Sequence, residues 1–298
     1  MQSIYVSSIG YAHGDRRSIS DLGDEAAVEL TAAQHGLADY RHSDLPPWQL
    51  AVQAGERSLA TAGGSPDLLL YISENDSDRP DSLARINNRL GLAGIDHLAV
   101  SGHGCGNLGP ALQVARDALR GGTYRRILLL LADRAVTGSR LMNSGMSIFS
   151  DGAAACMVTD GTAAGDDGLR FSVHGISVRT RSGGDAGLGE MDMLSLVELA
   201  GGGVADLLQA TGQRPEDFRH VVFGNYRIFS QHFLAAATGV PTERLLIGPI
   251  AEYGHCFSAD ILVTLDRYAA QGRVAPGDHL LAAATGPHSW STLAIEML

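Results

Sequence analysis

Two short segments of the sequence combine reactive side chains with glycines. Residues 99–109 (AVSGHGCGNLG) place Cys105 directly before an amphipathic stretch, and residues 252–260 (EYGHCFSAD) place His255 before another helical stretch. A cysteine at a helix start meets unpaired N–H groups and the positive end of the helix dipole, which favour its thiolate. This layout predicts an activated nucleophile with an imidazole as its proton carrier. A small buried cysteine in a tight turn and a capping or core histidine remain open alternatives.

The other two cysteines are expected to be inert. Cys156 lies in an apolar strand and reads as core, and the side chain of Cys256 is expected to point away from the site. Three cysteines in a chain of this length do not resemble a disulfide framework. No metal is expected, because the usual closely spaced Cys or His pairs of zinc sites are missing.

Strand-like and helix-like segments alternate along the chain and must position these residues. The periodicity of apolar residues predicts helices over residues 26–35, 47–62, 81–90, 109–120, 193–212, 228–238 and 258–271. Short apolar runs predict strands over residues 4–9, 67–73, 126–132, 151–159, 219–223, 279–285 and 291–297.

The order of these segments predicts an α/β fold with two similar halves. A helix-flanked strand followed by a strand pair occurs once in residues 1–160 and again in residues 161–298. The Gly/Asp-rich loop at residues 160–168 reads as the seam between the halves, and a second such loop occupies residues 181–190.

Composition and charge exclude several classes of function. The chain has 298 residues and a formal net charge of -11, which argues against nucleic acid as a partner. No apolar stretch reaches the roughly 20 residues that span a bilayer, and the N-terminus does not look like a signal peptide. We therefore expect a cytoplasmic protein without a membrane partner, and no cofactor.

Taken in order, the motifs resemble those of β-ketoacyl-acyl-carrier-protein synthase III and its acyltransferase relatives. The resemblance covers essentially the whole chain and rests on Gly104-Cys105-Gly106, Asp151-Gly152-Ala153, and the stretches 253–259 and 277–281. It implies the thiolase fold, with two α/β halves in an αβαβα arrangement. It also implies a nucleophilic Cys105 in the first half, His and Asn loops in the second, and a dimer formed through the central sheet.

The sequence departs from the family pattern at two loops. The family's histidine falls on Gly224, with Asn225 the nearest polar side chain, and the other donor position holds His255. The resemblance therefore implies a catalytic set of Cys105, His255 and Asn225. The family's last Gly-rich turn reads Ala284-Thr285-Gly286-Pro287-His288, where Pro287 has no N–H. Gly286, His288 and Gly224 are the positions expected to contact the substrate or its developing oxyanion.

Three functions fit this pattern. The first is an acyltransferase of secondary metabolism, which takes an acyl group from an acyl carrier protein or coenzyme A thioester and passes it to a small acceptor. The second is a decarboxylating condensing enzyme in which Asn225 compensates for the missing histidine. The third is a non-catalytic subunit that supports an active paralogue in a heterodimer, whereas the first two imply a homodimer.

Overall fold

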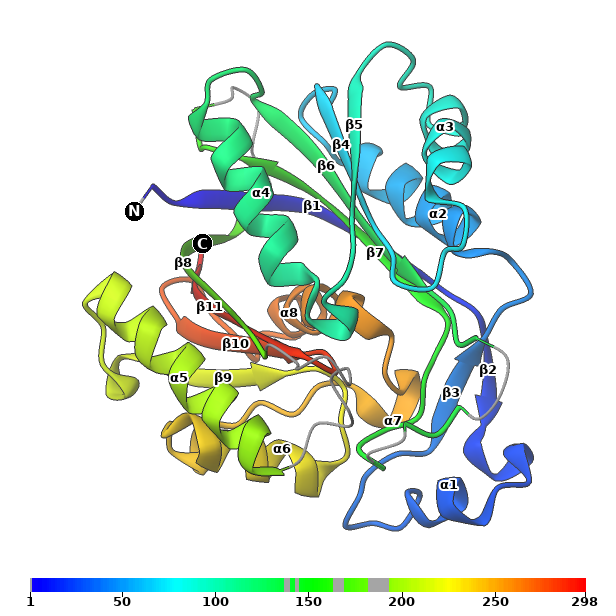
Figure 1. Cartoon of the computed structure of the whole chain (residues 1–298), viewed down its shortest axis with the longest axis vertical. Helices are drawn as coiled ribbons and strands as arrows, with labels where there is room; N and C mark the ends of the chain where they lie inside the picture. Colours follow the sequence, from blue (N-terminus) through cyan, green and yellow to red (C-terminus); the bar gives the residue numbers. More distant parts are fainter. Residues whose placement is uncertain (1, 137–139, 143–144, 163–168, 182–192) are drawn as a thin grey trace.

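The central feature is a nine-stranded mixed sheet with the strand order β5-β4-β6-β7-β1-β8-β11-β10-β9 (Figure 1). The structure is a computed structural model that describes residues 2–136, 140–142, 145–162, 169–181 and 193–298. The strands of this sheet are β1 (Ile4–His13), β4 (Leu68–Ile72), β5 (Asp96–Val100), β6 (Arg126–Asp133), β7 (Gly152–Thr159), β8 (Leu169–Thr180), β9 (His220–Phe223), β10 (His279–Thr285) and β11 (Ser289–Met297). A two-stranded sheet pairs β2 (Asp15–Ser18) with β3 (Asp39–His42).

The two halves of the large sheet repeat one topology outward from its middle. The antiparallel pair of β1 and β8 joins the halves. Outward from β1 the strand order is β7, β6, β4, and outward from β8 it is β11, β10, β9. In each half the two strands next to the middle pair are antiparallel to each other, and the next strand out is parallel. The expected α/β fold with two similar halves is therefore confirmed.

The chain passes from the first half to the second between β7 and β8. Most of the loop expected as the seam, residues 163–168, lies outside the described residues, as do residues 182–192 of the second Gly/Asp-rich loop. Because both halves share one hydrogen-bonded sheet, the division into residues 1–160 and 161–298 stays a prediction.

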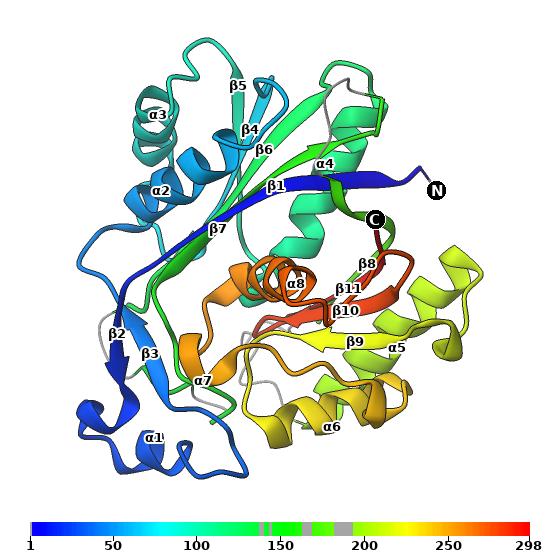
Figure 2. The same ribbon diagram turned by 180° about the vertical axis from the view of Figure 1, so that it is seen from behind.

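Helices cover both faces of the sheet and fill the layer between the halves. They are α1 (Glu25–Glu29), α2 (Pro47–Leu59), α3 (Arg79–Arg89), α4 (Leu108–Arg120), α5 (Met193–Thr211), α6 (Ile228–Thr238), α7 (Ile250–Tyr253) and α8 (Asp260–Ala270). Helices α2 and α3 pack on the outer face of the first half, and α5 and α6 pack on the outer face of the second (Figures 1 and 2). Helices α4 and α8 lie between the halves, which gives the αβαβα order of layers.

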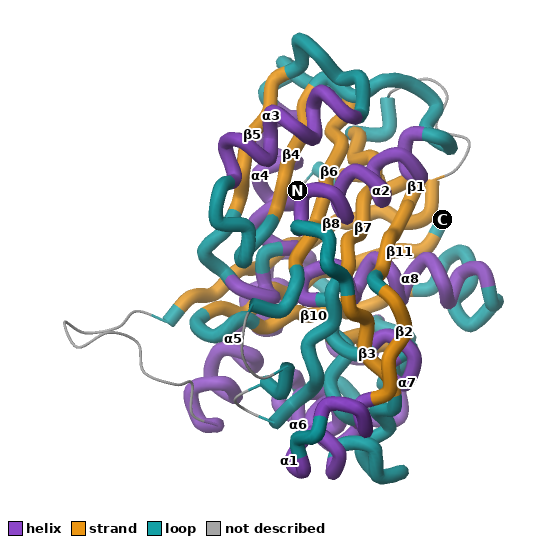
Figure 3. The backbone as a smooth tube through the Cα atoms, turned by 90° about the vertical axis from the view of Figure 1, so that its right-hand side faces the viewer, coloured by secondary structure: helices purple, strands orange, loops and turns teal. Residues whose placement is uncertain are grey.

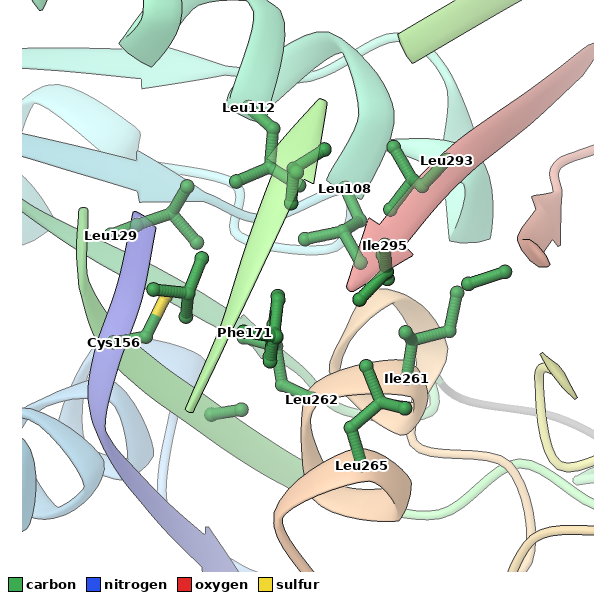
Figure 4. Packing of buried hydrophobic residues seen from close by; sticks show 14 of the residues in the cluster. Leu108, Leu112, Leu129, Cys156, Phe171, Ile261, Leu262, Leu265, Leu293 and Ile295 are labelled. Atoms are coloured by element: carbon green, nitrogen blue, oxygen red, sulfur yellow. The ribbon is translucent and has the colours of Figure 1, made fainter. Parts of the chain in front are cut away.

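Side-chain alternation along the strands separates the cores of these layers. Leu68, Leu70 and Ile72 of β4 face the central layer, while Leu69 and Tyr71 face α2 and α3. This period of two is what a strand covered on both faces requires. Figure 4 shows apolar side chains of α4 and α8 pointing toward each other between the strands. The central core therefore fixes the starts of α4 and α8 relative to each other.

The boundaries of several elements differ from the sequence prediction. The helix expected over residues 26–35 ends at Glu29, because the following turns place Leu30 and Leu37 in a small core against Ile148 and Ile250. Strand β5 was not predicted because its side chains are largely exposed, so it has no apolar run. Strand β8 was also missed, since it carries glycine and polar residues among its apolar ones. The backbone trace in Figure 3 shows β5 at the outer edge of the sheet.

Candidate active site

Cys105 lies in a sharp turn at the start of α4. The turn is a short 3₁₀ helix, Gly104–Gly106, and the Cys105 side chain is 7% exposed. Gly102 (φ 97°) and Gly104 (φ 55°) adopt left-handed backbone conformations that side chains disfavour. A Cβ on Gly104 would lie 2.5 Å from Cδ of Pro287, so the last loop also requires glycine there. The glycines predicted to permit an unusual turn around Cys105 do so.

Glu74 and Asn107 hold this turn in place. One carboxylate oxygen of Glu74, Oε2, accepts hydrogen bonds from the Gly102 amide (2.9 Å), the Gly104 amide (3.3 Å) and Asn107 Nδ2 (2.8 Å). Asn107 Oδ1 accepts from the His103 amide at 3.2 Å.

The amide of Cys105 differs from its neighbours. The Gly106 amide donates to the His103 carbonyl and the Asn107 amide to the Gly104 carbonyl, so both are occupied. The Cys105 N–H has no acceptor within the described part of the chain. A free amide on the nucleophile itself is suited to stabilise an oxyanion formed at that sulfur.

His255 is fully buried and is held on both sides by backbone and side-chain contacts. It follows α7, and its own amide and carbonyl bond to the Ile148 carbonyl (2.9 Å) and the Ser150 amide (2.8 Å). Its Nδ1 lies 2.5 Å from Oδ2 of Asp260, the first residue of α8. In this contact Nδ1 carries a proton and donates it to the Asp260 carboxylate. Nε2 is therefore the ring nitrogen that is available for proton transfer.

The Asp260 carboxylate is buried and fully engaged. In addition to His255, it accepts hydrogen bonds from the Asn225 amide (2.6 Å) and the Cys256 amide (2.8 Å). Its place in the first turn of α8 adds the favourable end of the helix dipole. Asp260 therefore orients His255 as a fixed carboxylate, a role that the sequence analysis did not assign.

Cys105 and His255 interact across the interface between the halves. Nε2 of His255 is buried and has no hydrogen bond of regular geometry among the described residues. Burial lowers the pKa of His255, but the Cys105 thiolate and the Asp260 carboxylate raise it more, so its pKa lies above the ordinary value. The site thus favours a protonated imidazole at His255, and the order of Cys105, His255 and Asp260 is the one that a nucleophile, a proton carrier and an orienting acid would require.

Asn225 contributes its backbone to this arrangement. Its amide holds Asp260, and its carbonyl accepts from Ser147 Oγ at 2.6 Å. Its buried side-chain oxygen forms no hydrogen bond among the described residues and lies against Gly248, where a Cβ would be only 2.4 Å away. Among the described residues the Asn225 side chain forms no hydrogen bond with His255 or Cys105, so its expected role as a stand-in donor stays a prediction.

The last loop packs directly on the nucleophile turn, with one correction to the sequence analysis. The Gly286 amide donates to the Ser289 carbonyl at 2.9 Å and is therefore not free to contact a substrate oxygen. Gly286 is needed for a different reason, because a Cβ there would lie 1.9 Å from the His103 carbonyl oxygen. His288 is half-buried, and its Nδ1 has no partner in the described residues, so its substrate contact stays a prediction.

Aromatic side chains surround His255. The ring of Tyr226 lies 5.1 Å from the His255 ring, and Phe149 and Phe257 each lie 5.8 Å from it, measured between centroids. Gly224 makes room for Tyr226, because a Cβ on Gly224 would lie 3.0 Å from the Tyr226 hydroxyl. The direct contact expected between Gly224 and the substrate stays a prediction.

The other cysteines behave as expected. All three cysteines are free. Burial raises the pKa of Cys156 to about 12, and burial together with nearby carboxylates raises that of Cys256. The Cys256 sulfur lies 3.8 Å from the Tyr253 carbonyl oxygen.

In the described ranges no group of three or more potential ligands gathers to hold a metal ion, and no helix is long and apolar enough to cross a bilayer.

Comparison with known proteins identifies relatives over both halves. The family model described as 3-oxoacyl-[acyl-carrier-protein] synthase III matches residues 102–175, and the model of that family's C-terminal part matches residues 208–297. β-Ketoacyl-[acyl-carrier-protein] synthase III of Rhizobium meliloti is 27% identical over 308 residues, covering 93% of this chain and 91% of the relative.

Two solved structures show the same fold. The 3-oxoacyl-[acyl-carrier-protein] synthase III of Aquifex aeolicus VF5 has a TM-score of 0.81 at 19% identity, over 98% of this chain and 99% of the other. A structure named ChlB3, described as an acyltransferase, has a TM-score of 0.77 at 22% identity, over 99% and 98% of the two chains.

Proposed function

The chain belongs to the ketosynthase III-like branch of the thiolase superfamily, and on that premise we propose that it transfers acyl groups through a thioester on Cys105. The observation that carries this proposal is the set Cys105, His255 and Asp260, with the Cys105 amide free beside the sulfur. The donor is an acyl thioester of an acyl carrier protein or coenzyme A, as the relatives' names suggest. The acceptor is a small hydroxyl, amine or thiol compound of secondary metabolism.

Acylation follows from this geometry. The Cys105 thiolate attacks the thioester carbonyl, and the new C–S bond converts the carbonyl oxygen into an oxyanion near the Cys105 amide. When the tetrahedral intermediate collapses, the donor's C–S bond breaks and the leaving thiolate takes the proton held on His255 Nε2. His255 is then neutral and is still oriented by Asp260.

Transfer to the acceptor reverses these roles. Neutral His255 takes a proton from the acceptor as it attacks the Cys105 thioester, a second oxyanion forms and collapses, and the Cys105 thiolate leaves. The acyl group is now on the acceptor, and the original imidazolium–thiolate pair is restored. One nucleophile, one base and one oxyanion site are sufficient for this cycle.

A decarboxylating condensation is the second candidate, and the names of the relatives favour it. In that reaction, relatives place two side-chain donors on the carbonyl that becomes an enolate, and the position of one of them is Gly224 here. Losing one such donor typically costs about 100- to 1000-fold in rate. This cost, together with the His255–Asp260 contact, supports simple transfer over condensation.

Intact-mass measurement after mixing with acyl-coenzyme A and acyl-carrier-protein thioesters tests the proposal. We expect an adduct of the acyl mass on the wild type and on Cys256→Ala, the matched control, but not on Cys105→Ala. Release of carbon dioxide from a malonyl thioester with a new C–C product would instead establish condensation. A wild type that takes up no acyl group from any donor would refute both candidates and leave the non-catalytic subunit.

We also propose that the chain pairs with a second copy through β5. This strand ends the sheet, pairs only with β4 within the described residues, and exposes its side chains, with Leu98 50% exposed. An exposed strand edge has unpaired N–H and C=O groups that another strand can satisfy. A homodimer that continues the sheet would cover this edge, whereas a paralogue in the same place would form the heterodimer.

A further inference from the structure

The nucleophile turn supplies one donor to the oxyanion site that the proposed reaction uses. A tetrahedral oxyanion is best stabilised by two donors, and the Cys105 amide is the one amide of the nucleophile turn without an acceptor among the described residues. In the last loop, the Gly286 amide already donates to the Ser289 carbonyl and Pro287 has no N–H. A buried side chain beside the site is another source of a second donor.

Tyr226 is the side chain whose position fits. It follows β9, is 0% exposed, and its ring lies 5.1 Å from the His255 ring. Its hydroxyl reaches the Thr285 carbonyl, the residue before Gly286, at 3.3 Å. The hydroxyl thus lies between His255 and the loop that packs on the Cys105 turn.

The Tyr226 hydroxyl is protonated, as a hydrogen-bond donor must be. Burial raises the pKa of Tyr226 well above its ordinary value, and the charges of Cys105 and Asp260 raise it further, so the hydroxyl keeps its proton. The bond to Thr285 is longer than the 2.5–3.0 Å usual for hydroxyl donors, so little is lost when the proton turns to a better acceptor.

We propose that the Tyr226 hydroxyl is the second oxyanion donor, acting with the Cys105 amide on the substrate's carbonyl oxygen. The inference rests on the proposed acyl transfer. As the Cys105 C–S bond forms, the Tyr226 proton swings from the Thr285 carbonyl to the developing oxyanion, and it returns when the oxyanion collapses. No proton is transferred by Tyr226, which stays a neutral phenol throughout.

Tyr226→Phe tests this role, and Tyr268→Phe is the matched control. Tyr268 is a buried tyrosine of α8 whose hydroxyl also donates to a backbone carbonyl, that of Ile247, but its hydroxyl bonds no residue of the site. We expect Tyr226→Phe to slow the acylation of Cys105 by acetyl-coenzyme A about 100-fold, as for the loss of one oxyanion donor, while Tyr268→Phe acylates as the wild type does.

Alkylation of Cys105 by iodoacetamide separates catalysis from structure. This displacement at carbon forms no oxyanion, so we expect Tyr226→Phe to be alkylated at the wild-type rate. Equal acylation rates in Tyr226→Phe and the wild type would overturn the inference and leave the acyl transfer intact. A parallel loss of alkylation and acylation would also overturn it, because it would show a structural role. A wild type that is not acylated at all would refute the proposed function itself.

Discussion

At the scale of single residues, the site depends on one buried carboxylate, which holds the candidate histidine. Asp260 fixes the imidazole of His255 through Nδ1 and is itself fixed by the Asn225 and Cys256 amides. A buried acid in such a position selects the tautomer that leaves Nε2 free and stabilises the imidazolium. Asp260 is thus a positioning residue, and its removal should affect both the rate and the pH dependence of acylation.

We expect Asp260→Asn to slow the acylation of Cys105 by about 100-fold or more, the usual share of a positioned acid or base. Asparagine keeps the shape of the side chain but removes the charge that raises the pKa of His255. Because acylation needs the proton on His255, the alkaline limb of the pH–rate profile should move to lower pH in the variant. Single-turnover acylation across the alkaline range measures both effects.

An unchanged alkaline limb in Asp260→Asn would show that Asp260 does not set the protonation of His255. The control is Asp266→Asn, which changes a partly buried carboxylate of α8 that pairs with Arg170. It should leave the profile as it is in the wild type.

At the scale of elements, the nucleophile turn depends on a contact from the end of β4. Glu74 accepts from two amides of the turn and from the Asn107 side chain, so it ties the turn to the first half of the sheet. The amides of Glu74 and Asn75 in turn donate to Asp133 at the end of β6. The position of Cys105 is therefore set by three elements rather than by α4 alone.

We expect Glu74→Ala to loosen this turn, because hydrogen bonds to a charged acceptor are worth about 1.5–3 kcal/mol each. Amide hydrogen exchange at Gly102 and Gly104 should become at least about tenfold faster, the effect of roughly 1.4 kcal/mol. The rate at which iodoacetamide alkylates Cys105 should also differ between Glu74→Ala and the wild type.

Glu74→Gln keeps an acceptor oxygen and serves as the matched control, so it should retain most of the wild-type protection. If Glu74→Ala exchanged at the wild-type rate, the turn would be held by α4 and the last loop instead.

The elements themselves were predicted unevenly, for a physical reason. Apolar runs and amphipathic stretches gave β4, β6, β7, α4 and α8 close to their observed bounds, since these elements are buried on at least one face. Strands β5 and β8 escaped prediction, because an exposed edge and a strand with glycine and polar residues among its apolar ones carry no clear apolar pattern. The helix α1 was predicted, but its end was placed too late.

At the scale of the whole molecule, the β5 edge is the surface through which we propose that a second copy binds. We expect the protein to sediment as a dimer and Leu98→Asp to shift it to monomer, because like charges would face each other across the two-fold axis. Phe229→Asp, which changes an exposed apolar side chain of α6, should remain dimeric.

Analytical ultracentrifugation at several protein concentrations measures this. A wild-type monomer at all concentrations would exclude the proposed homodimer, and an unaffected Leu98→Asp dimer would place the interface elsewhere.

By itself, the sequence determined the fold family, and it predicted Cys105 and His255 as the reactive pair. The turn around Cys105 and the start of α8 after His255 are local features, so glycines, apolar periodicity and motif order are enough to find them. The tertiary structure alone decided which groups meet there. Asp260 bonds His255 across a turn in which Phe257 is left-handed (φ 54°), and spacing does not reveal that geometry.

The same holds for Gly286 and Tyr226. The Gly286 amide is occupied by a bond within its own hairpin, and Tyr226 meets the site from the end of a different strand. Hydrogen-bond partners and contacts between distant segments depend on how the layers pack, and a single sequence does not record those distances.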